Sequence, residues 1–191
     1  MPSFFKELFY SFIPEPKGVE FHGEDKDEKI LLLLRRHVVT NIPWILISFG
    51  MMLVPFVIPQ VLLVGGFPLD GVIPTHYSLI LVLFWYLVTI TYIFESYLSW
   101  YSNVYIVTSK RLVDVDFYGI LSIRVSEAPI TNIEDVTYTL KGIAATIFNY
   151  GSVIVQTAGE SRELEFELVP KPAVVHDRIS DLATEVRNAK S

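Results

Sequence analysis

The sequence predicts an α+β protein in which a two-helix transmembrane hairpin is followed by a β-rich domain with a capping helix. Three observations carry this prediction. Apolar residues are concentrated between Ile42 and Tyr101 of the 191-residue chain. From Ser102 onward, apolar and polar residues alternate as they do in strands. A single pattern with helical spacing begins near Lys171 and closes the chain.

The composition points to a membrane protein and excludes several kinds of site. The chain is 51% hydrophobic, with a mean hydropathy of +0.43, which is high for a soluble protein of this size. Its formal net charge of −6 argues against nucleic acid as a partner. The absence of cysteine excludes disulfides and thiolate metal sites.

Residues 1–41 are interpreted as an N-terminal amphipathic and linker segment that ends in a basic stretch before the membrane. Lys6 and Glu7 interrupt the first apolar run, which is unlike a secretory signal peptide. The aromatic and leucine residues of this run recur at helical spacing, and they are Phe4, Phe5, Leu8, Phe9 and Phe12. They predict a short helix lying on the membrane or on the β-domain, with a frayed hydrophobic terminus as the alternative.

Two apolar segments have the length of membrane spans, and together they make a predicted hairpin over residues 42–101. The first, Ile42–Val64, carries no charge, and at ~1.5 Å per residue it covers the ~30 Å hydrocarbon core. Two internal prolines should bend it. The second, Tyr77–Tyr101, has Glu95 as its one acidic residue. Because the connecting loop is short, the two spans must be antiparallel.

The distribution of basic residues predicts the orientation of this hairpin. The loop Gly65–His76 contains no Lys or Arg. Four basic residues lie beyond the opposite end of the hairpin, and they are Arg35, Arg36, Lys110 and Arg111. The positive-inside rule therefore places both termini in the cytoplasm.

Residues 102–191 form the predicted β-domain. Six strands are expected over residues 103–109, 111–119, 120–129, 132–142, 151–159 and 162–169. In the second strand, alternation is interpreted as placing Val113, Val115 and Phe117 inward and Asp114 and Asp116 outward. The same reasoning places Leu121, Ile123 and Val125 of the third strand inward. It also places Leu164, Phe166 and Leu168 of the sixth strand inward, with Glu163, Glu165 and Glu167 outward. The closing helix carries an apolar stripe of Val175, Ile179, Leu182 and Val186.

Three motifs resemble those of a known family. They are Y-x-V-T-x-x-R-L-V-D-x-D from Tyr105 to Asp116, I-x-x-V from Ile133 to Val136, and G-S-V-I-V-Q-T-A-G from Gly151 to Gly159. Together with the hairpin before them, they are similar to bacterial membrane-associated pleckstrin-homology (PH) proteins of the YdbS-like group.

The resemblance implies a PH-like bent β-sandwich or barrel of seven strands, capped by the C-terminal helix, at the cytoplasmic (inner) membrane of a bacterium. Tyr105, Thr108, Arg111 and Leu112 are then expected to set strand and turn structure. The seventh strand should come from a split of residues 120–136 or from Ile143–Asn149. The resemblance implies no firm activity.

The sequence lacks the motifs of catalysis and of cofactor binding. It has no phosphate-binding glycine loop, no nucleophile elbow and no histidine pair at metal-binding spacing. We therefore predict no enzyme activity and no catalytic, cofactor or metal residues. Glu95 is a candidate intramembrane functional acid. The structural alternative is that its side chain reaches the interface or approaches Arg36 or His37.

The basic residues near the hairpin are candidates for contact with lipid headgroups. Arg35, Arg36, Lys110 and Arg111 could each contribute on the order of 1 kcal/mol to binding an anionic surface. Alternatively, they only set the topology. Residues 102–191 contain nine Lys and Arg against twelve Asp and Glu, which disfavours a strong anionic-lipid pocket.

The function that these observations favour is a membrane-anchored adaptor whose β-domain binds a protein or peptide through a sheet edge or the helix–sheet groove. One alternative is a sensor of anionic headgroups or a component of an envelope-stress response. A weaker alternative is an oligomeric channel or transporter subunit with Glu95 lining its interior. The expected partners are membrane lipid and a protein of the same membrane, with self-association possible and no nucleic acid.

Overall fold

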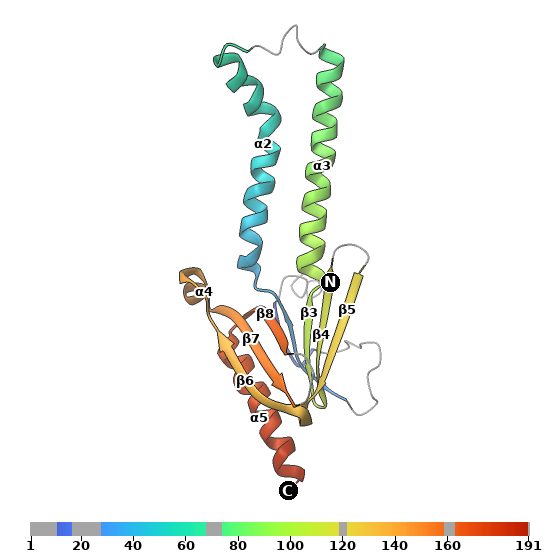
Figure 1. Cartoon of the computed structure of the whole chain (residues 1–191), viewed down its shortest axis with the longest axis vertical. Coiled ribbons are helices and arrows are strands. Elements are labelled where there is room, and N and C mark those ends of the chain that lie inside the picture. Colours follow the sequence, from blue (N-terminus) through green and yellow to red (C-terminus); the bar gives the residue numbers. More distant parts are fainter. Residues whose placement is uncertain (1–10, 17–27, 68–73, 119–121, 159–162, 191) are drawn as a thin grey trace. The chain divides into compact units, whose positions relative to one another are not determined.

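The structure is a computed structural model that describes residues 11–16, 28–67, 74–118, 122–158 and 163–190. The chain divides into two compact units. The first, which we call the β-unit, combines Met1–Thr40 with Ser99–Ser191, and the second, the helix unit, is Asn41–Leu98 (Figure 1). The helix unit is therefore an insertion within the β-unit, so the β-unit is built from segments on both sides of it.

The larger sheet of the β-unit is antiparallel and has five strands in the order β1-β2-β3-β4-β5. Their bounds are Phe12–Pro14 for β1, Ile30–Arg35 for β2, Val104–Thr108 for β3, Arg111–Tyr118 for β4 and Ser122–Pro129 for β5. A short 3-10 turn, η2 (Ile130–Asn132), leads from β5 to the second sheet.

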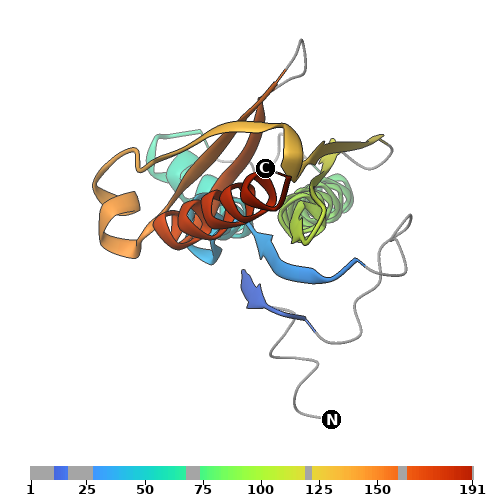
Figure 2. The ribbon, with the colours of Figure 1, turned by 90° about the horizontal axis from the view of Figure 1, so that it is seen from below.

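The second sheet is antiparallel, with the strands β6 (Ile133–Thr139), β7 (Tyr150–Thr157) and β8 (Leu164–Pro170) in that order. A helix of one and a half turns, α4 (Ile143–Phe148), joins β6 to β7. The C-terminal helix α5 (Pro172–Lys190) packs against β6 and β7, and Figure 2 shows it crossing this sheet. The β-unit is thus a mixed helix-and-sheet structure, with two antiparallel sheets and one long helix.

The core of the β-unit lies between the two sheets and α5. Its largest fully buried side chains include Tyr105, Leu112, Phe166 and Ile179. The predicted stripe of α5 is confirmed, because Val175, Ile179 and Leu182 are buried in this core and Val186 packs against it. Burial of an aliphatic side chain contributes about 1.5–3 kcal/mol, so α5 is held by its apolar face.

The N-terminal side of the insertion supplies strands that the sequence did not predict. Residues 30–35, interpreted as part of the stretch before the membrane, form β2 and pair with β3. Neither expected position of the seventh strand is found among the described residues, because residues 143–148 form α4 and residues 122–136 belong to β5, η2 and β6. Most of the predicted N-terminal amphipathic helix and of the linker lies outside the described residues, but Phe12 belongs to β1.

The predicted faces of β4 are wrong, as are those of Ile123 and Val125 in β5, while Leu121 lies outside the described residues. In β4, Leu112 and Asp114 face the core between the sheets, whereas Val113 is buried on the opposite face with Ile30 and Ile106. In β5, Ile123 and Val125 are exposed, by 62% and 55%. The outer face of this sheet is therefore apolar, and Asp114 and Asp116 of β4 point inward.

In β8, the predicted inward positions of Leu164 and Phe166 are confirmed, but the pattern fails after them. Leu168 adopts the left-handed backbone conformation, with φ of 51°, so Val169 is buried in its place. The register of β7 with β8 shifts between Gly151 and Val153, which is typical of a β-bulge.

The helix unit consists of α2 (Ile42–Val64) and the first part of α3 (Thr75–Ser102), after a 3-10 turn η1 (Val38–Asn41). Both helices are long and apolar enough to cross a membrane by length and composition. In each helix 6% of the most apolar window is buried in this structure, whereas the core helix of a soluble protein is mostly buried.

One hydrogen bond between the two helices explains the position of a tryptophan in the middle of α3. Pro55 has no N–H, so it leaves the carbonyl of Met51, four residues earlier, without its helical donor. The indole N–H of Trp85 donates to that carbonyl at 2.8 Å. Helix breaks within a bilayer require such replacement partners, because lipid supplies none.

Candidate functional site

Ionisable side chains gather at one end of the space between the two sheets. The inward row of β4 changes from Leu112 to Asp114 and then to Asp116 as the strand approaches the β3 residue Val104. Val104 follows α3 by two residues and pairs with Arg35 of β2. This end of the β-unit is therefore the one at which the chain leaves toward α2 and returns from α3. We call it the insertion end.

The Arg36 cluster is the group formed at the insertion end by Arg36, Tyr105, Asp114, Asp116 and Glu167. Arg36 forms an ion pair with Glu167 of β8 through its Nη2 atom. The backbone carbonyl of Arg36 accepts a hydrogen bond of 3.0 Å from the indole of Trp100. Tyr105 and Asp114 are directly opposite each other in the β3–β4 register, and both are buried. One arginine is thus surrounded by three carboxyl groups and a phenol.

Asp114 is the most perturbed acid of this cluster. Its side chain is 7% exposed, and its Oδ1 atom has no hydrogen-bond partner among the described residues. Burial raises the pKa of Asp114 to about 7, and the negative charges of Asp116 and Glu167 act in the same direction. Arg36 and Arg124 oppose this shift. Asp114 is therefore a buried carboxyl group that exchanges its proton near neutral pH.

Tyr105 is held in its position by packing rather than by a hydrogen bond. Its ring stacks on Phe166 with a centroid distance of 4.9 Å. No hydrogen bond of good geometry joins its hydroxyl to a described residue, although the charge of Arg36 acts on it. Burial raises the pKa of Tyr105, so the phenol stays neutral. The sequence predicted a structural role for this tyrosine, and its position in the core agrees with that role.

The Arg36 cluster offers little for catalysis. A neutral phenol and a charge-compensated arginine are poor nucleophiles, and no serine, cysteine or histidine belongs to the group. No set of three His, Asp or Glu side chains in the described part of the chain is placed to hold a metal ion. What this cluster can do is bind or release a proton between the two sheets.

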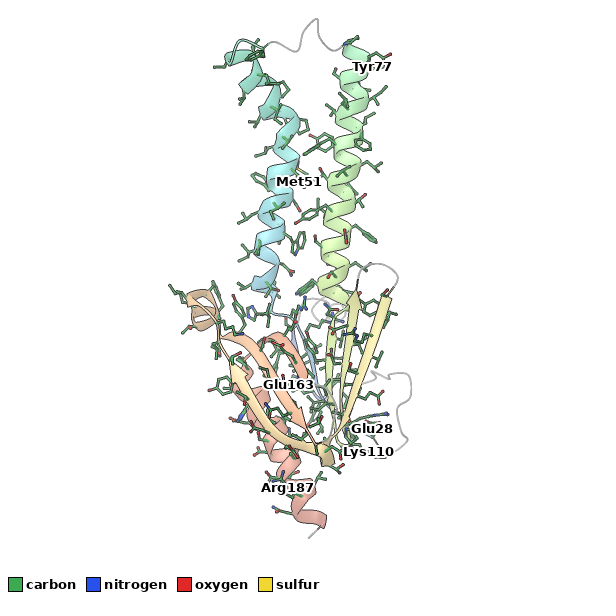
Figure 3. The ribbon with its side chains drawn as sticks, viewed as in Figure 1. Glu28, Met51, Tyr77, Lys110, Glu163 and Arg187 are labelled. Carbon is green, nitrogen blue, oxygen red and sulfur yellow. The ribbon has the colours of Figure 1, made fainter. Side chains whose placement is uncertain are left out.

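Arg111 and Lys110 lie at the opposite end of β3 from Arg35 and Arg36. Arg111 binds Glu28, whose side chain is fully buried, through Nε at 3.1 Å and Nη2 at 2.9 Å. Thr108 Oγ1 lies 2.6 Å from Glu28 Oε1. Hydrogen bonding to Glu28 raises the pKa of Arg111. Figure 3 shows Glu28 and Lys110 together at this end.

This separation matters for the predicted lipid contacts. Strand β3 has five residues, and at ~3.3 Å per residue it separates the two basic pairs by roughly 17 Å. The four residues therefore do not form one patch on the β-unit. Thr108 and Arg111 instead connect the β3–β4 turn to Glu28, two residues before β2, so the Y-x-V-T-x-x-R-L part of the motif has a structural role.

Arg35 remains at the insertion end. Its guanidinium group lies over the ring of Tyr101, 4.3 Å from the centroid. Its Nε and Nη1 atoms are buried and have no hydrogen-bond partner among the described residues. A cation–π contact of this kind contributes about 0.5–2 kcal/mol. Arg35 thus connects β2 to the last turn of α3, which belongs to the β-unit.

Glu95 lies on α3 within the helix unit, and its side chain is exposed. No described residue of α2 or α3 forms an ion pair with it. Glu95 therefore stays a candidate functional acid, with a structural role at the interface as the alternative.

A second feature is the free edge of the five-stranded sheet at β5. Strand β5 pairs with β4 on one side, and no other described strand pairs with it. Ile123 and Val125 are exposed on its outer face and lie opposite Phe117 and Val115 of β4. We call these four residues the edge patch. Exposed apolar edge strands are sites at which another strand adds to a sheet.

Comparison with known families decides the classification. The family described as the bacterial PH domain matches residues 42–183, which is well over half of the chain. The chain belongs to this bacterial PH-domain family. The match begins at the first residue of α2 and extends into α5, so it includes the inserted helices but not β2. The resemblance predicted from the sequence motifs is confirmed. Proteins of this family are typically non-catalytic.

One solved structure with detectable similarity is a DUF1696 family protein with a pleckstrin-homology domain from Shewanella loihica PV-4. It is 17% identical in sequence, with a TM-score of 0.35, and the alignment covers 42% of this bacterial PH-domain chain and 70% of the other. A search of curated proteins finds no match.

Proposed function

We propose that this bacterial PH-domain protein is a membrane-anchored adaptor that binds an extended segment of a partner protein along the edge of β5. The observation that carries the proposal is the exposed edge patch on an eight-residue strand without a second neighbour among the described strands. Strand addition would satisfy the free backbone groups of β5 and bury Ile123 and Val125.

The anchoring part of the proposal rests on the helix unit. Two apolar helices of sufficient length, joined by a loop without Lys or Arg, fit an antiparallel pair across the bacterial cytoplasmic membrane. The positive-inside rule then places the β-unit and both termini in the cytoplasm. The Trp85 bond to the free Met51 carbonyl supports this view, because it satisfies a backbone group that lipid could not.

The geometry of the edge limits the partner sequence. Successive side chains of an added strand would point alternately to the outer face and to the inner face of the sheet. Its outward-facing residues would lie beside Ile123 and Val125, so they should be apolar. Residues of the opposite parity would lie beside Arg124 and Ser126, so they should be polar. We therefore expect a segment of alternating apolar and polar residues.

Anchoring raises the local concentration of the adaptor for partners in the same membrane. A tethered module meets membrane proteins at an effective concentration far above its average in the cell. A weak edge-strand interaction is then sufficient for selective binding. The β-unit needs no affinity for lipid to reach its partner.

Sensing of anionic headgroups is the second candidate function, and the unpaired Arg35 nitrogens at the insertion end favour it. Of the four residues predicted to contact headgroups, Arg35 and Arg36 lie at that end, and Arg36 is already paired with Glu167. Lys110 and Arg111 lie at the other end of β3. Among the four predicted contacts, Arg35 would therefore act alone, which makes this site weaker than the edge patch.

The test is photocrosslinking of the full chain in native bacterial membranes. A benzophenone amino acid replaces Ile123 in one variant and Val174, an apolar and exposed residue of α5, in the control. We expect a protein adduct from position 123 only, and we expect Val125→Lys to abolish it. Mass spectrometry of the adduct should identify an alternating segment. Equal adducts from both positions would refute the adaptor, and adducts to phospholipid alone would favour the headgroup sensor.

A further inference from the structure

The short helix α4 presents apolar side chains to solvent. Ile143, Ile147 and Phe148 are 81%, 70% and 49% exposed, which is unusual for three large apolar residues within six positions. Ala145 is buried and fixes α4 on the β-unit. Asn149, in the left-handed conformation with φ of 52°, ends the helix and directs the chain into β7. The three side chains are therefore held outward by a defined turn.

A series of contacts within the β-unit places α4 at the insertion end. Tyr150, two residues after α4, stacks on His37 at 5.4 Å between ring centroids. His37 directly follows Arg36, whose carbonyl binds Trp100 near the end of α3. The backbone N–H of His37 also donates to Leu168 of β8 at 2.8 Å. The exposed apolar residues of α4 thus lie near the points where the chain passes to α2 and returns from α3.

The charge pattern around α4 suits an anionic surface. Residues 136–158 contain no Asp or Glu, and Lys141 is their one basic residue. Lys141 is exposed and precedes α4 by two residues. The backbone of Lys171, a second exposed lysine, donates to the carbonyl of Asn149 at 2.9 Å. Apolar side chains flanked by lysines are typical of segments that lie in the interfacial layer of a bilayer.

We propose that α4 inserts Ile143, Ile147 and Phe148 into the interfacial layer of the membrane that the two helices cross. This inference rests on the anchoring proposed above, and it adds a third point of contact to the two spans. A third attachment of the β-unit to the membrane would restrict its tilt more than the two spans do alone. The contact would therefore hold the β5 edge in a constant orientation toward its partner.

A bilayer is a better occupant of this surface than a protein. The apolar residues lie on a helix of only six residues, which is too short for the i to i+7 pattern of a helix that binds in a groove. Described residues of the β-unit leave most of Ile143 and Ile147 and about half of Phe148 uncovered. They also lie at the end from which two apolar helices depart.

Because the chain has no cysteine, a single introduced cysteine can carry a fluorophore at a chosen position. We would label three full-length variants in nanodiscs of phosphatidylethanolamine and phosphatidylglycerol. Ile147→Cys tests α4, Val57→Cys in α2 is the reference in lipid, and Glu185→Cys in α5 is the reference in water. The quenchers are a spin-labelled phospholipid and aqueous iodide.

We expect the fluorophore at position 147 to be quenched by the spin-labelled lipid and protected from iodide, as at position 57 and unlike position 185. Introducing Ile143→Asp should reverse this pattern, and since residue 143 is exposed, this change removes no core contact. A fluorophore at 147 that behaves like 185, while 57 is in lipid, would overturn the inference and leave the anchoring intact. A fluorophore at 57 that is open to iodide would overturn the anchoring itself.

Discussion

Replacing Asp114 by asparagine should make the β-unit more stable at neutral and alkaline pH. The carboxyl group is 7% exposed, and its pKa is raised from 3.8 to about 7, chiefly by burial. At ~1.4 kcal/mol for each tenfold change in proton affinity, ionising Asp114 costs at most about 4 kcal/mol more in the folded protein than in the unfolded chain. Asparagine has nearly the same shape and no charge, so Asp114→Asn removes that penalty.

The direction of the pH dependence follows from where the proton binds more tightly. The folded protein holds the Asp114 proton at a higher pH than the unfolded chain does. The stabilising contribution of protonated Asp114 to the free energy of unfolding is therefore fully present below about pH 4, and it is lost as the pH rises through about 7. In the wild type, the free energy of unfolding should fall over this range. In Asp114→Asn this component of the pH dependence should be absent.

We expect Asp114→Asn to be more stable than the wild type by about 2 kcal/mol at pH 8. This is half of the upper limit, because the buried amide N–H groups of asparagine need partners of their own. For a domain of this size the change corresponds to a rise in Tm of several degrees. At pH 4 the two proteins should be equal, or the variant slightly less stable.

The assay is thermal unfolding of the full chain in detergent micelles at several pH values between 4 and 8. Near-ultraviolet circular dichroism follows the aromatic side chains of both units, and Asp135→Asn, at an exposed position of β6, is the control. A variant that is less stable than the wild type at pH 8 would refute the reasoning. It would mean that Asp114 is ionised and stabilised by Arg36, in spite of its burial.

Two further predictions concern single polar contacts. Trp85→Phe should destabilise the helix unit by about 1 kcal/mol in lipid, because it removes the hydrogen bond to the Met51 carbonyl. In a Pro55→Ala background, residue 55 supplies the helical N–H to that carbonyl, so the same change should cost much less. A double-mutant cycle, measured by unfolding from bicelles, compares the two effects. An equal effect in both backgrounds would contradict this. Arg111→Ala should lower the stability of the β-unit by about 3–5 kcal/mol, because it leaves the fully buried Glu28 carboxylate uncompensated. Glu28→Gln in the same chain should recover part of that loss in thermal unfolding, and no recovery would show that packing of the arginine stem dominates.

The sequence was most informative where periodicity extends over many residues. The two apolar helices and the stripe of α5 follow from three or more turns of consistent pattern. The strands from β3 to β8 were located to within a few residues, because turn residues separate them. The edges and order of the sheets were not predicted, since alternation says nothing about which strands are neighbours.

Strand β2 was missed because it does not alternate. Five consecutive apolar residues, Ile30 to Leu34, fill a strand that has neighbours on both sides and is largely buried on both faces. A short apolar run of this kind cannot be distinguished from other buried segments by periodicity. Its position before a long apolar helix favoured the reading as a stretch before the membrane.

The faces of β4 were reversed for a related reason. Period-two alternation divides a strand into two rows but does not show which row faces the core. The assignment followed the rule that carboxylates are rarely buried. Asp114 is an exception, since its neighbours Tyr105, on β3, and Arg36, directly after β2, are not close to it in the sequence and cannot be identified from the local pattern. The candidate edge patch was hidden by the same error, because Ile123 and Val125 were assigned to the core.

The insertion between β2 and β3 connects the proposed anchoring to the proposed binding. Arg35 and Val104 are direct partners in the sheet, although 68 residues separate them in the chain. Closing a loop of that length opposes pairing by an entropy that grows with the logarithm of its length. Association of the two apolar helices beforehand would bring the ends of β2 and β3 together and remove most of that cost. A chain inserted in the bilayer would then complete its five-stranded sheet more readily than one in water, so the β5 edge would form where its proposed partner lies.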